Sequence, residues 1–168
     1  MRLFISINLA DNIKEAIMDV QDSMMFCGIG GNYTRPENMH ITLAFIGEFA
    51  DPELVLNQIE RVRLEPFTIS LKGIGTFRGL WWIGLEESEE LKTLAKRIRR
   101  SLAEAGIPFD RKKFSPHITL VRRPEGELSD LPAEAIESIT GVSMTVDHVS
   151  LMRSDRGKRG MVYKEIGR

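Results

Sequence analysis

The chain has 168 residues, of which 42% are apolar and 28% are charged, and its formal net charge is −1. These values are typical of one globular domain and exclude an intrinsically disordered chain. We therefore expect a single folded unit over residues 1–168. The small net charge also argues against long, nonspecific contacts with nucleic acid.

Membrane and disulfide-rich classes are disfavoured as well. The N-terminal stretch MRLFISINLA reaches Asp11 after a short apolar run without a small-residue cleavage pattern. No later segment approaches the roughly 18 apolar residues of a membrane span. The single cysteine, Cys27, can form no internal disulfide, and there is no Cys-x-x-Cys pair for structural zinc. We expect a cytoplasmic monomer without membrane contact.

The chain is predicted to alternate between strands and helices. Helical spacing of apolar residues begins at Asp11, and Asp51-Pro52 is typical of a helix start. The predicted strands cover residues 3–10, 39–48, 67–75, 80–86, the second HITL run from 117, 143–154 and 160–168. The predicted helices cover residues 11–25, 51–61 and 88–105, with a further short helix after Asp130.

This order favours an α+β fold of mostly antiparallel sheets with flanking helices, rather than a doubly wound parallel sheet. The tetrapeptide HITL occurs twice, at His40–Leu43 and at His117–Leu120, nearly half the chain apart. The two copies contain two of the three histidines in the chain. The repeat predicts two similar lobes, related by a pseudo-two-fold axis, that face a central cleft.

Each copy of HITL presents one polar and one apolar face. In a strand the side chains alternate, so His40 and Thr42 share a face and lie roughly 6 to 7 Å apart. The same holds for His117 and Thr119. Two imidazoles and two hydroxyls on opposite sides of a cleft suit a phosphodiester. One imidazole can accept a proton from water, the other can donate one to a leaving oxygen, and the hydroxyls can bind the nonbridging oxygens.

Two alternatives compete with this acid–base interpretation. Catalytic zinc usually has three protein ligands, whereas no carboxylate stands at a ligand-like spacing from either HITL, so metal-free chemistry without a cofactor is favoured. The second alternative is a noncatalytic module that binds the terminal phosphate of an RNA. The presence of both histidines and both threonines favours the enzyme.

Basic residues surround the second motif. Such a cluster can be a solvated surface, but around a histidine motif it is what a phosphate ligand requires. The residues are Arg111, Lys112, Lys113, Arg122 and Arg123.

Other aromatic and histidine residues are weaker candidates. His148 lacks a threonine two residues later and is expected to be structural or on the surface. Trp81 and Trp82 should point to opposite faces of their strand, with one in the core and the other able to stack on a base.

The stretches RPENMHITLAFIGE and KFSPHITLVRR resemble the two signature segments of the two-histidine phosphoesterase superfamily, whose mark is a duplicated His-x-Thr/Ser-x motif. Within it the chain is similar to the RNA 2′,3′-cyclic phosphodiesterase family, also called 2′-5′ RNA ligase. The likeness runs from MRLFISINL through Trp82-Ile83-Gly84 to the closing strands.

The resemblance implies a site in which His40, Thr42, His117 and Thr119 meet in the cleft and Arg122 binds phosphate. It implies opening of a 2′,3′-cyclic phosphate, on RNA 3′ ends such as tRNA fragments or on small nucleotides, to a 2′-phosphate. Some members also join RNA ends through a 2′-5′ bond. By analogy with the family, His40 is the proton donor and His117 the proton acceptor, and the cations around His117 favour a neutral imidazole there.

Overall fold

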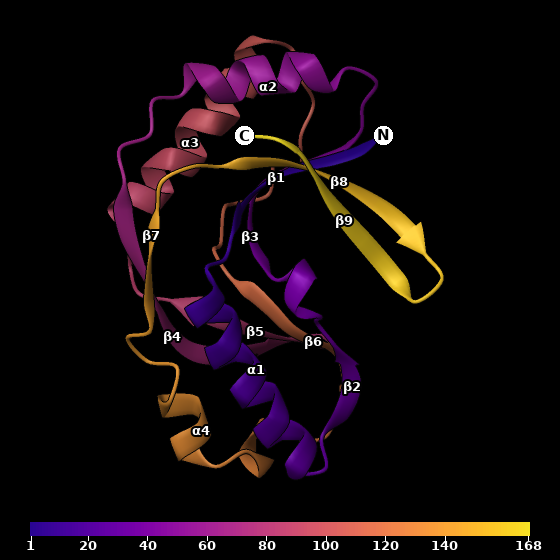
Figure 1. Ribbon diagram of the computed structural model, residues 1–168, viewed down its shortest axis with the longest axis vertical. Coiled ribbons are helices and arrows are strands. Elements are labelled where there is room, and N and C mark those ends of the chain that lie inside the picture. Colours follow the sequence, from indigo (N-terminus) through magenta and orange to yellow (C-terminus); the bar gives the residue numbers. More distant parts are fainter.

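The computed structural model describes residues 1–168 and contains two antiparallel sheets (Figure 1). The four-stranded sheet has the order β3-β1-β8-β9, and the five-stranded sheet has the order β2-β6-β5-β4-β7. The strands are β1 (Arg2–Asn8), β2 (Gly30–Tyr33), β3 (His40–Glu48), β4 (Phe67–Phe77), β5 (Leu80–Leu85), β6 (Ile118–Glu125), β7 (Ser143–Val146), β8 (Ser150–Gly157) and β9 (Gly160–Gly167).

Two helices cover each sheet on its outer side (Figure 1). We call the four-stranded sheet with α2 (Pro52–Arg61) and α3 (Glu89–Glu104) the first lobe. The five-stranded sheet with α1 (Asp11–Phe26) and α4 (Ala133–Glu137) is the second lobe. None of these helices combines the length and the apolar composition that crossing a membrane would need.

The predicted helix starts are confirmed by their caps. The Asp51 carboxylate accepts a hydrogen bond from the Leu54 amide at 3.1 Å, and the Ser88 hydroxyl accepts one from Leu91 at 3.1 Å. Both side chains satisfy a backbone donor that the first turn of a helix leaves without an intrahelical partner.

The two faces of each motif strand differ as predicted. In the first lobe Ile41 and Leu43 are fully buried on the helix-covered face, while His40 and Thr42 are only partly covered on the other. In the second lobe Ile118 and Leu120 are fully buried. The α+β class with antiparallel sheets is thereby confirmed, and both HITL copies present their polar residues on the side away from the core.

Three details differ from the sequence-based prediction. The short strand β2 lies just after the first predicted helix, where no strand was predicted, because pairing with β6 stabilises it. The run 143–154 is two strands in different sheets, since β7 pairs with β4 while β8 pairs with β1. Each lobe also combines segments from both halves of the chain, so the repeat in sequence does not divide the molecule into an N-terminal and a C-terminal lobe.

Candidate active site

His40 is the first residue of β3 and lies opposite Asn8 of β1. Its Nδ1 lies 2.7 Å from the Asn38 carbonyl oxygen, and its Nε2 lies 2.9 Å from the Thr42 hydroxyl. A carbonyl can only accept, so Nδ1 carries the hydrogen and the neutral ring accepts the Thr42 hydroxyl hydrogen at Nε2. The Asn38 carbonyl thus selects the tautomer of His40.

His117 immediately precedes β6, and its ring is oriented by a backbone carbonyl in the same way as that of His40. Its Nδ1 donates to the carbonyl of Ser115, two residues upstream, over 2.8 Å. Thr119 follows on β6 and lies opposite Trp82 of β5. In both motifs the backbone therefore engages Nδ1, which leaves Nε2 as the nitrogen that can exchange a proton with a ligand.

The two motif strands lie close enough for their charges to interact. Strand β3 contacts β6, and both His117 and Arg122 interact electrostatically with His40. The guanidinium of Arg99, on α3, donates to the Leu43 carbonyl at 3.0 Å and to the Lys112 carbonyl at 2.7 Å. This side chain ties the first motif to the loop that leads into the second.

A side chain of α1 also links the two motif regions by hydrogen bonds. The amide of Gln21, which is only 5% exposed, donates to the Thr34 carbonyl at 2.9 Å and to the Leu120 carbonyl at 3.2 Å. It thus links the segment before the first motif to the last residue of the second.

Aromatic side chains surround His40. The ring centroid of His40 lies 5.0 Å from that of Phe4 and 5.3 Å from that of Tyr163, and these two rings are 5.1 Å apart. The resulting burial is the largest cause of a lowered pKa for His40. The Asn38 carbonyl opposes the shift, while electrostatic interactions with His117 and Arg122 add to it. The His40 imidazole is therefore neutral at pH 7 when no ligand is bound.

Asn38 also anchors the edge of the first lobe. Its side-chain amide and the Arg35 guanidinium each donate to the Met161 carbonyl of β9 at 2.9 Å. Asn38 therefore links β9, which carries Tyr163, to the turn whose carbonyl orients His40.

Sequence reasoning missed Asn38 and Phe4, and a polar residue two positions before each histidine was the only local signal for Asn38.

A model of the 2′-5′ RNA ligase superfamily matches residues 29–158, more than half of the chain. The chain belongs to this superfamily. It is 31% identical to an RNA 2′,3′-cyclic phosphodiesterase of Archaeoglobus fulgidus, over 99% of this chain and 98% of that protein. A Thermus thermophilus protein of the same description is 32% identical, over 97% of this chain and 86% of that protein.

Solved structures of similar proteins agree with this membership. The chain superposes on apo E. coli LigT with a TM-score of 0.83 and 27% identity, covering 98% of this chain and 94% of that one. LigT has also been solved with 3′-AMP, where the TM-score is 0.81. The family predicted from the two motifs is confirmed, and with it the prediction of an enzyme.

The structure brings together the predicted family residues His40, Thr42, His117 and Arg122, with Thr119 on the same strand as Arg122. His148 lies apart, in the connection between β7 and β8, where its Nδ1 is 2.6 Å from the Asp147 carboxylate. No three or more His, Cys, Asp or Glu side chains are grouped so that they could hold a metal ion.

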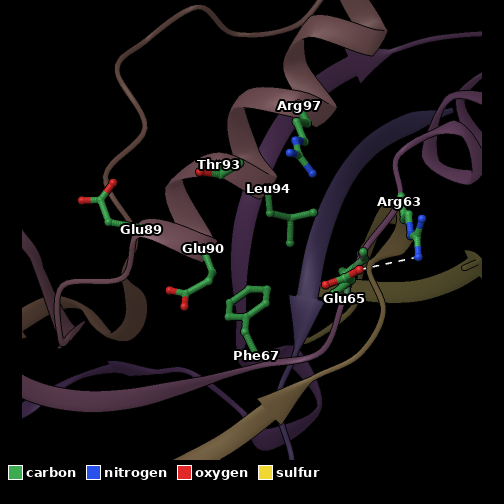
Figure 2. Close-up of a pocket in the computed structure, with 9 residues that line it drawn as sticks. Arg63, Glu65, Phe67, Glu89, Glu90, Thr93, Leu94 and Arg97 are labelled. Atoms are coloured by element: carbon green, nitrogen blue, oxygen red, sulfur yellow. Dashed lines mark ion pairs between the residues drawn. The ribbon is translucent and has the colours of Figure 1, made fainter.

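A hollow of about 530 Å³ lies elsewhere, between α3 and the segment that leads into β4 (Figure 2). It contains neither motif, and its Arg63–Glu65 ion pair, at 3.6 Å, joins two exposed side chains. Its polar lining is mostly solvated surface charge. The lining residues are Arg63, Leu64, Glu65, Phe67, Glu89, Glu90, Thr93, Leu94 and Arg97.

Proposed function

We propose that the protein is a metal-independent RNA 2′,3′-cyclic phosphodiesterase that opens a terminal 2′,3′-cyclic phosphate to a 2′-phosphate. The observation that carries the proposal is the repeated Nδ1-to-carbonyl bond, at 2.7 Å for His40 and 2.8 Å for His117. It leaves the Nε2 of each ring, in facing lobes, as the nitrogen that can exchange a proton. The names of the full-length relatives supply the substrate class.

Water attacks the phosphorus, and His117 Nε2 takes the proton of that water as the new P–O bond forms. The P–O3′ bond breaks, and His40 Nε2 donates its proton to the departing 3′ oxygen. The product keeps the phosphate on O2′. Thr42, Thr119 and Arg122 bind the nonbridging oxygens, with Arg122 suited to a charge-assisted, bidentate contact.

His40 must gain its proton when the substrate binds, because its pKa is lowered in the empty site. An anionic phosphate beside the ring opposes that shift by stabilising the imidazolium. Protonation also frees the Thr42 hydroxyl hydrogen, which is bonded to His40 Nε2 in the empty site. The same event therefore creates the acid and makes Thr42 a donor for the phosphate.

The same chemistry accounts for ligation. If the 5′ hydroxyl of a second RNA replaces water as the nucleophile, O3′ departs in the same way and the product is a 2′-5′ phosphodiester. We therefore include this activity in the proposal, with tRNA fragments among the RNA substrates. Because both motifs lie in the same chain, the proposed site needs no second copy, and we propose that a monomer is active.

The test is hydrolysis of adenosine 2′,3′-cyclic phosphate in excess chelator, with the product identified by ³¹P NMR. We expect turnover that the chelator does not change, and 2′-AMP as the product. Tight binding without turnover would instead identify a noncatalytic module. Loss of turnover with chelator, or 3′-AMP as the product, would contradict the mechanism.

A further inference from the structure

Trp82 lies flat on the second lobe, next to the second motif. Its indole ring lies over the backbone of Gly75 and Gly84. If either glycine carried a side chain, the Cβ atom at Gly75 would lie 2.1 Å from Trp82 Cζ2, and the Cβ atom at Gly84 would lie 3.3 Å from Trp82 Cζ3. Gly75 is its cross-strand partner on β4, and Gly84 is the next residue on the same face of β5. One face of the indole therefore rests on backbone where no side chain intervenes.

The indole stands beside the groups that are proposed to hold phosphate. Trp82 is the cross-strand partner of Thr119, and its ring centroid lies 6.3 Å from that of His117 at an interplanar angle of 62°. Trp82 is partly exposed, whereas Trp81 points the other way and is only 6% exposed. The sequence-based question of which tryptophan belongs to the core is thus decided.

The first lobe has no such platform. The residue opposite Thr42 is Ser6, which is fully buried and donates its hydroxyl to the Asn8 side chain at 3.0 Å. The aromatic rings near His40, those of Phe4 and Tyr163, pack against each other and against the imidazole. Among the three aromatic rings beside the motif histidines, only that of Trp82 therefore has one face packed on glycine backbone.

We propose that Trp82 stacks on the nucleobase of the nucleotide whose phosphate the two motifs hold. The proposal rests on the proposed function, because the phosphate position sets where the attached ribose and base lie. A flat indole accepts any base, because every base has a π face. The site therefore takes a nucleoside phosphate rather than a bare phosphate ester, with purines bound more tightly than pyrimidines because they stack over a larger area.

The test uses Trp81→Phe, in which Trp82 is the only tryptophan and reports on its own surroundings. We expect 2′-AMP to quench its fluorescence and inorganic phosphate, which lacks a base, to leave it unchanged. If this core variant fails to fold, the difference in quenching between the parent and Trp82→Phe provides the same information.

Affinity supplies an independent readout. Trp82→Ala should weaken 2′-AMP binding about 5- to 150-fold, the factor that corresponds to one stacked base. Its affinity for inorganic phosphate should not change, and Trp82→Phe should recover most of the loss. Binding of 2′-AMP without quenching, at equal affinity in Trp82→Ala, would overturn stacking while leaving the phosphodiesterase intact. Quenching by 2′-AMP without any turnover of the cyclic phosphate would support stacking and overturn the proposed function.

Discussion

The first and second lobes carry the same tetrapeptide at the start of a strand, yet they surround it differently. Strand β3 is an edge strand of its sheet, whereas β6 lies between β2 and β5. In the first lobe both nitrogens of His40 are hydrogen-bonded and the ring is packed by Phe4 and Tyr163. In the second lobe the structure shows only the Nδ1 bond of His117, and the nearest ring is that of Trp82. The motif supplies the same histidine and threonine in both lobes, and the neighbours make the two histidines unequal.

The largest expected effect comes from removing either imidazole. His40→Ala and His117→Ala should each lower kcat/KM for a 2′,3′-cyclic phosphate by about 10² to 10⁴, the usual contribution of one acid or base. His148→Ala is the matched control and should keep parental activity, because that ring bonds Asp147 away from the motifs. Near-normal turnover in either motif variant, with circular dichroism unchanged, would refute the assignment.

A smaller loss is expected from Arg122→Lys. The charge stays, but the planar fork that can hold two phosphate oxygens is lost, and we expect KM to rise about 10- to 100-fold. Arg123→Lys is the control, because the Arg123 side chain is also exposed. The Arg123 backbone N–H donates to the Gly79 carbonyl at 2.7 Å, and the substitution leaves that bond in place. Equal KM values for Arg122→Lys and the parent would make Arg122 an ordinary surface residue.

Asn38→Ala tests whether the first lobe orients its histidine through β9. Losing the bond to Met161 should lower kcat about 2- to 10-fold with little change in KM, the range for one hydrogen bond. ¹⁵N chemical shifts of His40 should change from one tautomer to a mixture. Asn57→Ala, on the exposed side of α2, should change neither. A single retained tautomer together with parental kcat would exclude this positioning role.

Arg122→Met should produce the smallest effect, a rise in the pKa of His40. Positive charge at Arg122 disfavours the imidazolium, so its removal makes protonation easier. The pKa should stay below its ordinary value, because burial, the larger cause, remains. NMR titration of the His40 ring would measure the change, and a pKa that stays constant or falls would contradict the proximity of Arg122.

The sequence was sufficient for the parts of the fold and site that depend on local chemistry. Asp51 and Ser88 each cap the helix that follows them, and strand alternation alone separates His40 and Thr42 from Ile41 and Leu43. The duplicated motif therefore indicated the family.

Long-range pairing explains what the sequence left open. Phe4 and Tyr163 come from opposite ends of the chain and meet at His40 only because β1, β8 and β9 join one sheet. The cations near the second motif were expected to act on His117, whereas the charge of Arg122 lowers the pKa of His40 in the facing lobe. Lobes that mix both halves of the chain cannot be deduced from the spacing of a repeat.

The division of proton transfer between the lobes is the central claim, and a change of leaving group tests it most directly. A cyclic phosphate with sulfur in place of the 3′ oxygen releases a thiolate, which needs far less help from an acid because a thiol is much more acidic than an alcohol. We predict that this substrate restores much of the activity of His40→Ala and little of that of His117→Ala. Equal restoration in both variants, or restoration of His117→Ala alone, would contradict the claim.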